Sequence, residues 1–239
     1  MIKRIIKNII YGNKSCSEKY VKYLRGKGAK IGEGVYFFSP ETANIDSVRC
    51  DWISIGNNTK ITSGFTMLAH DYSSSVLIGK YHGILLPGGS ETIIGSNCFV
   101  GVNVTILPGV TIGDNVIIGA GSVVTSNIPS NMVVGGAPAK IIFSLEKYYE
   151  KRKENYLIDA IRNGNHFYDI NGRYPFVNEC GAFSVLFLER TEDNYTMYIK
   201  DYLAPGNDEA SVRKAFFETN PQFGSYEEYI NFLKKEHQG

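Results

Sequence analysis

The sequence has no long uninterrupted hydrophobic run and no excess of charge of either sign. Its 25 Lys and Arg residues are nearly balanced by 24 Asp and Glu residues, which leaves a formal net charge of +1. Nucleic-acid modules usually have a strongly basic surface, so this balance argues against a nucleic-acid partner. Without a run of about 20 apolar residues we expect no membrane span, and the first residues lack the apolar core of a secretory signal. We therefore expect a cytoplasmic protein.

Cysteine is scarce and scattered. The residues Cys16, Cys50, Cys98 and Cys180 form no CxxC pair and no dense framework. A disulfide scaffold would need a denser and more regular set, so we expect reduced, packed thiols.

Basic residues are concentrated in the first 30 positions, where nine Lys and Arg residues are opposed only by Glu18. Isoleucines lie between these charges at helical spacing and should gather on one face: Ile2, Ile5, Ile6, Ile9 and Ile10. The favoured interpretation is a helical segment over residues 1–29 that packs its isoleucines on the body and solvates its lysines. The alternative is a weak peripheral contact between this basic segment and an anionic membrane surface.

A six-residue period dominates the middle of the chain. Branched aliphatic residues recur at steps of six, at Ile94, Val100, Ile106, Ile112, Ile118 and Val124. A strict step of six does not fit a helix, but it fits short strands separated by corners. Gly95, Gly101, Gly113 and Gly119 follow four of these positions, and we expect them to supply the backbone freedom of a sharp corner. A less regular copy of the pattern begins near residue 30.

The period is lost between Met67 and Thr92. This excursion, residues 68–91, contains His70 and His82 among polar and aromatic residues. A loop that leaves a regular scaffold often carries function, so we look for the site there.

The repeat resembles the hexapeptide-repeat acyltransferases, in particular the branch with maltose, galactoside and xenobiotic acetyltransferases. The most specific stretches are VGVNVTILPGVTIGDN at 100–115 and VVGGAPAK at 133–140. The resemblance implies a mainly β fold, a left-handed parallel β-helix over residues 30–142. It also implies acetyl-CoA as co-substrate and a homotrimer with active sites in the grooves between the β-helices of neighbouring subunits.

Apolar residues at outward-facing positions agree with a covering partner: Ile93, Phe99, Ile117 and Val123. A neighbouring subunit would cover such a row. The chain's own carboxyl-terminal part is the alternative.

Beyond residue 142 the repeat ends and aromatic residues become frequent. We expect a small α+β extension over residues 143–239. The predicted helices are 144–162, 207–217 and 225–235, and the predicted strands are 184–189 and 195–200.

Acetyl transfer to a hydroxyl group needs a base, and histidine, with a pKa of about 6.5, suits this task near neutral pH. The resemblance places the catalytic histidine at the start of the excursion, where this chain has His70. His82 is the nearest competitor. Asp71 and Glu91 are candidates to orient the imidazole, although ordinary solvated carboxylates explain both equally well.

For the acceptor, we expect contacts from Asn44, Asp71, Tyr72, His82 and Glu91. The resemblance implies an asparagine in the acceptor groove, and counting back twelve residues from Gly56 reaches Asn44. A turn asparagine is the alternative there.

For coenzyme A, the resemblance implies the outer face of the later coils, with Phe99, Val102, Gly119, Ala120, Thr125, Ser126 and Lys140. Main-chain groups at Val102, Gly119 and Ala120 would bond the pantetheine arm. Lys140 would meet the phosphates.

The favoured function is an acetyl-CoA-dependent O-acetyltransferase that acts on a sugar hydroxyl in surface polysaccharide biosynthesis. A xenobiotic or antibiotic acetyltransferase, or an amino-sugar N-acetyltransferase, is the alternative enzyme. A trimeric scaffold is the alternative without catalysis. A zinc enzyme on this coil would need three converging histidines, and only His70 and His82 lie near it, so we expect no metal.

Overall fold

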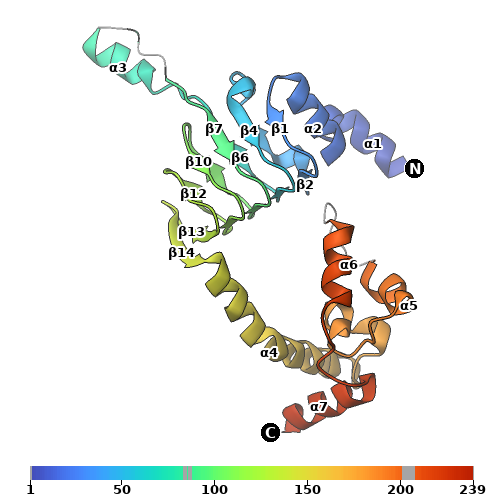
Figure 1. Cartoon of the computed structure of the whole chain (residues 1–239). Helices are drawn as coiled ribbons and strands as arrows, with labels where there is room; N and C mark the ends of the chain where they lie inside the picture. Colours follow the sequence, from blue (N-terminus) through green and yellow to red (C-terminus); the bar gives the residue numbers. More distant parts are fainter. Residues whose placement is uncertain (1, 83–84, 86–87, 201–207, 239) are drawn as a thin grey trace. The chain divides into compact units, whose positions relative to one another are not determined.

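The six-residue period winds into a coil of short parallel strands (Figure 1). The computed structural model describes residues 2–82, 85, 88–200 and 208–238. The chain divides into two units, Met1–Tyr148 and Tyr149–Gly239, and the coil belongs to the first. Each of the strands β1 to β9 pairs with the strand three places further along the chain, so the coil has three faces.

The three faces each contain strands from successive turns of the coil. Face A contains β1 (Lys30–Ile31), β4 (Ile53–Ile55), β7 (Thr92–Ile94) and β10 (Thr111–Ile112). Face B contains β2 (Tyr36–Phe37), β5 (Lys60–Ile61), β8 (Phe99–Val100), β11 (Ile117–Ile118), β13 (Met132–Gly135) and β14 (Lys140–Ser144). Face C contains β3 (Asn44–Ile45), β6 (Thr66–Met67), β9 (Thr105–Ile106) and β12 (Val123–Val124). The strands pair in parallel except β13 and β14, which are antiparallel.

The aliphatic positions of the repeat fill the interior of the coil. Val100, Ile106, Ile118 and Val124 are completely buried, and Ile94 and Ile112 nearly so. Alternate residues of a strand point to opposite sides, so the residues between them face outward. Each buried isoleucine contributes about 1.5–3 kcal/mol relative to an exposed one, which makes this column the main apolar stabilisation of the coil.

Close stacking of successive turns of the coil explains why glycine recurs in the repeat. A Cβ atom on Gly95 would lie 2.5 Å from Oδ1 of Asp114, and one on Gly101 would lie 2.6 Å from the nitrogen of Ala120. Gly113 is similarly crowded, and none of the three has a positive φ. The expectation that these glycines supply backbone freedom for the corners was therefore wrong. They are glycines because a side chain would collide with the next turn of the coil.

Asparagine and glycine occupy the left-handed positions of the corners. The φ angle is 56° at Asn97, 57° at Asn103 and Asn115, and 71° at Gly121. Asn97 Nδ2 donates to Oδ1 of Asn115 at 2.7 Å, and Asn115 Nδ2 donates to Oδ1 of Asn131 at 3.0 Å. These side chains form a ladder along one corner, so they both permit the turn and fix the stacking register.

Two helices precede the coil, α1 (Ile2–Tyr11) and α2 (Ser17–Gly26), joined by the 3₁₀ turn η1 (Gly12–Lys14). Helix α2 buries Tyr20 and Leu24. The ring of Tyr20 meets that of Phe37 edge to face, with centroids 5.1 Å apart. Helix α2 therefore caps the first turn of the coil.

Helix α1 turns its apolar face outward. Ile6, Ile9 and Ile10 are 50%, 77% and 65% exposed. Lys7 is less exposed, and its Nζ lies 3.5 Å from Glu41. The prediction that the isoleucines pack on the body was wrong for these residues, because polar contacts hold the opposite face of the helix there.

The excursion contains a helix, α3 (Ser74–Tyr81), that projects away from the coil (Figure 1). None of its residues is buried. Val76 and Tyr81 are largely exposed although both are apolar over most of their surface.

All the regular elements among the described residues of the second unit are helical. They are α4 (Leu145–Asn171), which begins in the first unit, then η4 (Val177–Glu179), η5 (Gly181–Leu186), α5 (Glu192–Asn194), the π-helical turn η6 (Tyr195–Ile199), α6 (Glu209–Phe217) and α7 (Tyr226–Gln238). The predicted α+β extension was wrong: the ranges 184–189 and 195–200 contain helical turns, not strands. Leu186, Tyr195 and Ile199 are buried there, so packing in a helical core overrides their strand preference.

The predicted helix 207–217 starts at a residue outside the described ones, and α6 begins at Glu209. No helix among the described residues is long and apolar enough to cross a membrane.

The cysteines are free thiols, as expected. Cys50, Cys98 and Cys180 are buried, and burial raises the pKa of Cys180 to about 12. Cys16 is exposed, so the expectation of packing fails for that residue.

A comparison of two glycine variants tests the stacking account. Gly95→Ala is expected to lower the free energy of unfolding by about 3 kcal/mol, because the new methyl group would overlap the next coil. Gly121→Ala should cost only about 1 kcal/mol, since its φ is +71° but nothing lies within 4 Å of the new atom. Urea unfolding of both variants measures the difference, and equal losses would contradict close stacking at Gly95.

Candidate active site

Two irregular segments leave the coil at the same corner, between faces C and A. The first follows β3, runs from Asp46 to Trp52 and ends in the 3₁₀ turn η3 (Cys50–Trp52). The second follows β6 and is the excursion 68–91. The strands β3 and β6 are paired, with Asn44 opposite Thr66, so the two segments begin side by side.

Asp46 and His70 meet where these segments begin. Nδ1 of His70 is hydrogen-bonded to Oδ2 of Asp46, whose side chain is 1% exposed. The same oxygen accepts from the main-chain N–H groups of Ala69 and His70 at 3.0 and 3.1 Å. Oδ1 accepts from the N–H groups of Val48 and Arg49 at 3.0 and 2.9 Å. A buried carboxylate needs such partners, and here both oxygens are fully engaged.

The charge of Asp46 determines which nitrogen of His70 is free. Burial raises the pKa of Asp46, but the hydrogen bonds from Arg49, Ala69 and His70 outweigh burial and hold the pKa below its ordinary value. The carboxylate is therefore ionised at neutral pH and accepts a hydrogen bond from Nδ1–H. In the neutral imidazole the free lone pair is then on Nε2.

Nε2 of His70 is buried and has no hydrogen-bond partner in the described part of the chain. An unsatisfied buried polar atom costs about 1–3 kcal/mol, and a donor brought by a substrate would remove that cost. Nε2 is thus placed to receive a proton.

Two aromatic residues, Tyr72 and Trp52, lie near the pair. The ring of Tyr72 stands edge-on to His70, with centroids 5.1 Å apart. A Cβ atom on Gly89 would lie 3.0 Å from Cζ3 of Trp52 and 3.4 Å from Cβ of His70, so the excursion returns past both side chains. The guanidinium carbon of Arg49 lies 4.8 Å from the centroid of the Trp52 ring, at an exposed position.

The two predicted orienting carboxylates do not touch the imidazole in the structure. Oδ1 of Asp71 accepts from the N–H and hydroxyl groups of Ser73, and these bonds lower the pKa of Asp71. Glu91 is exposed and lies 3.5 Å from Nζ of Lys30. The structure favours the alternative of ordinary solvated carboxylates for both, and Asp46 is the carboxylate that is hydrogen-bonded to the imidazole.

The other two predicted acceptor residues, Asn44 and His82, lie before and after this corner in the sequence. Asn44 is exposed at the start of β3, two residues before Asp46. His82 is exposed at the end of α3 and stops that helix in a left-handed conformation, with φ at 48°. The helix α3 therefore separates His82 from His70.

Sequence reasoning missed Asp46, Arg49 and Trp52. The six-residue register could have found Asp46, because Ile45 pairs with Met67 and the excursion starts directly after Met67. The additional residues of the first irregular segment hid that correspondence.

The predicted coenzyme A residues lie at both edges of face C. Thr125 and Ser126 follow β12 at the corner that also carries His70, and both are exposed. Val102, Gly119 and Ala120 lie at the opposite corner, between faces B and C. Phe99 is exposed on face B, and Lys140 is exposed at the start of β14.

The main chain of Gly119 is already used by the coil. Its N–H donates to the carbonyl of Val134 at 2.8 Å, and its carbonyl accepts from the hydroxyl of Ser122 at 2.5 Å. The exposed Ala120 is the better candidate for a main-chain bond to a ligand at this corner.

The expected outward row of apolar residues does not exist. Ile93 lies on face A, Phe99 and Ile117 are paired neighbours on face B, and Val123 lies on face C. A partner that covers the coil is therefore not supported by that pattern.

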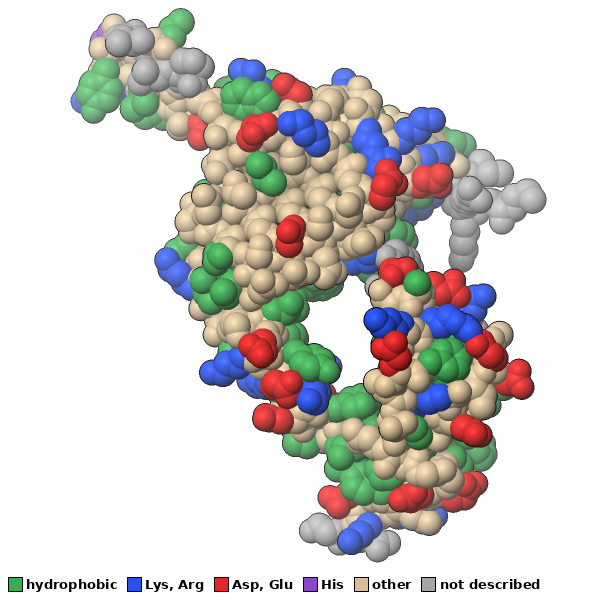
Figure 2. Space-filling view, viewed as in Figure 1, with side chains coloured by type: hydrophobic (Ala, Val, Ile, Leu, Met, Phe, Trp, Pro, Cys, Tyr) green, Lys and Arg blue, Asp and Glu red, His purple; other side chains and the backbone are tan. Residues whose placement is uncertain are grey.

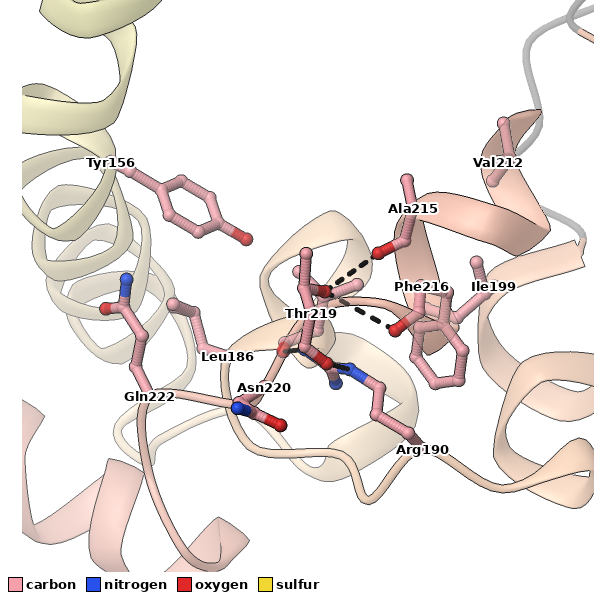
Figure 3. Close-up of a pocket in the computed structure, with 11 residues that line it drawn as sticks. Tyr156, Leu186, Arg190, Ile199, Val212, Ala215, Phe216, Thr219, Asn220 and Gln222 are labelled. Carbon is pink, nitrogen blue, oxygen red and sulfur yellow. Dashed lines mark hydrogen bonds between the residues drawn. The ribbon is translucent and has the colours of Figure 1, made fainter.

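A separate cavity of about 460 Å³ lies within the second unit, between α4, η5, η6 and α6 (Figure 3). Its lining is mainly apolar, with the Tyr156 hydroxyl pointing inward. Arg190 donates to the carbonyl groups of Val185, Leu188 and Thr219 at 3.0, 2.6 and 2.9 Å, so its guanidinium has a structural role. None of the predicted site residues lines this cavity.

Comparison with known proteins agrees with the repeat. The family model described as "Bacterial transferase hexapeptide (six repeats)" matches residues 91–126. Protein CapG of Staphylococcus aureus is 42% identical over 132 residues, which cover 55% of this chain and 75% of CapG. WbbJ of Escherichia coli strain K12, named a putative lipopolysaccharide biosynthesis O-acetyl transferase, is 36% identical over 55% of this chain and 71% of its own. The serine acetyltransferase of Neisseria gonorrhoeae, solved with serine, is 28% identical with a TM-score of 0.37, over 48% of this chain but only 40% of its own.

The pH dependence of stability tests the buried carboxylate. Because the folded-state pKa of Asp46 is lowered, its charge contributes stability that is fully present above the unfolded value of about 3.9 and is lost as pH falls through the folded value. The difference in unfolding free energy between wild type and Asp46→Asn should therefore shrink as the pH is lowered past 4. Urea unfolding over a pH series measures it.

Asp71→Asn is the matched control, since that carboxylate is exposed and its hydrogen bonds are screened by water. A difference for Asp46→Asn that stays constant with pH would contradict the buried, ionised carboxylate.

Proposed function

Because this chain belongs to the bacterial hexapeptide-repeat acyltransferases, we propose that it transfers an acetyl group from acetyl-CoA to a hydroxyl group of a sugar, in surface polysaccharide biosynthesis in the cytoplasm. The Asp46–His70 pair, with its unpartnered Nε2, carries the proposal for the transfer chemistry. The similarity to WbbJ, which is named a putative lipopolysaccharide biosynthesis O-acetyl transferase, supports the choice of a saccharide hydroxyl as acceptor.

His70 acts as the general base. Nε2 accepts the proton of the acceptor hydroxyl as its oxygen bonds to the acetyl carbonyl carbon, and it then returns that proton to the sulfur as the carbon–sulfur bond breaks. Acetyl-CoA supplies the activated acyl group as a thioester. The proton balance closes within one turnover, and no metal takes part in these steps.

Asp46 positions this base. Its carboxylate holds Nδ1–H and so fixes both the tautomer and the ring orientation, and it stabilises the imidazolium formed during the transfer. The four main-chain N–H bonds keep the carboxylate ionised and in place, so it does not need to take up the proton itself.

The acceptor lies against the aromatic side of the pair. Trp52 and Tyr72 provide apolar surface for the faces of a sugar ring, while Arg49 and Asn44 provide hydrogen-bond donors at the same corner. We also propose Asp71, His82 and Glu91 as outer contacts of the acceptor, since each is exposed.

Acetyl-CoA reaches His70 from a neighbouring subunit. Within one chain, Val102, Ala120 and their neighbours lie at the edge of face C opposite His70. A neighbouring subunit that packs its edge between faces B and C against the His70 corner would bring its own Phe99, Gly119 and Lys140 toward the base, while Thr125 and Ser126 of the first chain already lie at that corner. We propose the homotrimer of left-handed coils on this ground, with the exposed apolar side chains of α3 covered by a neighbour.

Substitution of the two histidines of the excursion tests the base. His70→Ala is expected to lower kcat by about 10²–10⁴-fold, the usual contribution of a general base. His82→Ala is the matched control: as an outer contact beyond α3 it can raise KM, but it should leave kcat within about twofold. The measurement is thiol release from acetyl-CoA with a panel of sugars, amino sugars and antibiotics.

The panel also separates the alternatives. Full turnover by His70→Ala would remove the mechanism. Activity on an amine or an antibiotic alone would replace the sugar hydroxyl as acceptor, and no binding of acetyl-CoA at all would favour a scaffold.

Mixed trimers test the shared site. Sedimentation equilibrium should give three times the 26.6 kDa chain. Neither His70→Ala nor Ala120→Trp should be active alone, the second because its indole would fill the coenzyme A corner. Co-expression of the two should restore roughly a quarter of the wild-type activity, because a random trimer pairs an intact base with an intact coenzyme A corner at about one interface in four. No recovery on co-expression would place the whole site within one chain.

A further inference from the structure

The apolar face of α1 is exposed and continuous. Ile6, Ile9 and Ile10 lie three and four residues apart, which places them on one side of a helix. In the sequence, Ile2 and Ile5 continue the same spacing toward the amino terminus. This surface contains isoleucine only, with no polar residue among these positions.

The opposite side of α1 is held on the body by polar contacts. Lys7 pairs with Glu41 at 3.5 Å, and Oδ1 of Asn8 accepts from Nζ of Lys19 at 2.9 Å. Rotation of the helix to bury its isoleucines on the coil would break both contacts. The apolar face is thus presented outward by the way in which the helix is attached.

Basic residues predominate in the sequence around this face. Helix α1 has Lys3, Arg4 and Lys7 and no acidic residue in its first turn, and the first 30 residues contain nine basic residues against Glu18 alone. Figure 2 shows Lys and Arg side chains, with some Asp and Glu side chains among them, at the end of the coil where α1 and α2 lie. Two copies that met through α1 would bring these like charges together, which disfavours self-association there.

We propose that α1 docks the protein on an anionic membrane surface. The helix has 10 residues, about 15 Å of length, so it is too short to span a bilayer and lies in the plane of the interface. Its isoleucines enter the boundary between headgroups and acyl chains, and the positive charge of the amino-terminal sequence, Lys3 and Arg4 included, attracts the anionic headgroups. This docking goes beyond the proposed acetyl transfer and does not depend on it.

Vesicle sedimentation of the full chain tests the docking. The chain is expected to sediment with vesicles that contain phosphatidylglycerol and phosphatidylcholine, and at least tenfold less with phosphatidylcholine alone, since each basic residue near the surface is worth about fivefold in affinity. High salt should reduce the binding, because it screens exposed charge.

Substitutions separate the apolar and electrostatic parts. Ile9→Gln with Ile10→Gln should weaken binding at least tenfold, because each buried isoleucine side chain is worth about that factor. Ile170→Gln is the matched control and should bind as wild type, since Ile170 is an equally apolar, 68% exposed residue on α4. Lys3→Gln with Arg4→Gln should weaken binding to the anionic vesicles and leave that to phosphatidylcholine unchanged.

Three results would overturn the proposal. The first is wild type that sediments with neither kind of vesicle, and the second is a paired isoleucine variant that binds as tightly as wild type. The third is a fall in molecular mass of that variant without a change in vesicle binding, which would make the isoleucine face a contact between copies. No acetyl-CoA is present in these assays, so their outcome is independent of the acetyl-transfer test.

Discussion

The close approach of the backbone in successive turns of the coil determines the arrangement of the rest of the first unit. Gly95 and Gly101 leave no room for a side chain between coils, and the asparagine ladder through Asn115 holds the register. Because the register is fixed, segments that leave the coil at the same corner begin beside each other whatever the length of chain between them. Asp46 and His70 are brought together in this way, although the sequence separates them by 24 residues.

The site is built where the repeat is interrupted. A regular coil has short corners and a filled interior, so it offers little room for chemistry. Two interruptions at one corner supply a buried carboxylate, a histidine and a tryptophan, while the strands beneath keep them in place. Burial makes the carboxylate useful, since its hydrogen bonds hold it ionised where water would otherwise weaken its effect on the imidazole.

The sequence predicted the parts that follow from periodicity and not those that follow from insertion or attachment. The strand positions, the aliphatic interior and the excursion that contains His70 follow from the six-residue step. Asp46 was missed because extra residues after Ile45 broke the count. Helical spacing correctly grouped the isoleucines of α1, but spacing alone cannot tell which face meets the body. The predicted strand at 195–200 failed because Tyr195 and Ile199 pack as well in a helical core as in a sheet.

We propose that Asp46 holds Nδ1–H of His70 and leaves Nε2 as the proton acceptor. Long-range ¹⁵N–¹H NMR of the ring nitrogens distinguishes the two tautomers directly, and the chain has only four histidines, so His70→Ala assigns the signals. The neutral imidazole of His70 is expected to carry its proton on Nδ1, and Asp46→Asn should remove that preference. A proton on Nε2 in the wild-type protein would contradict the account.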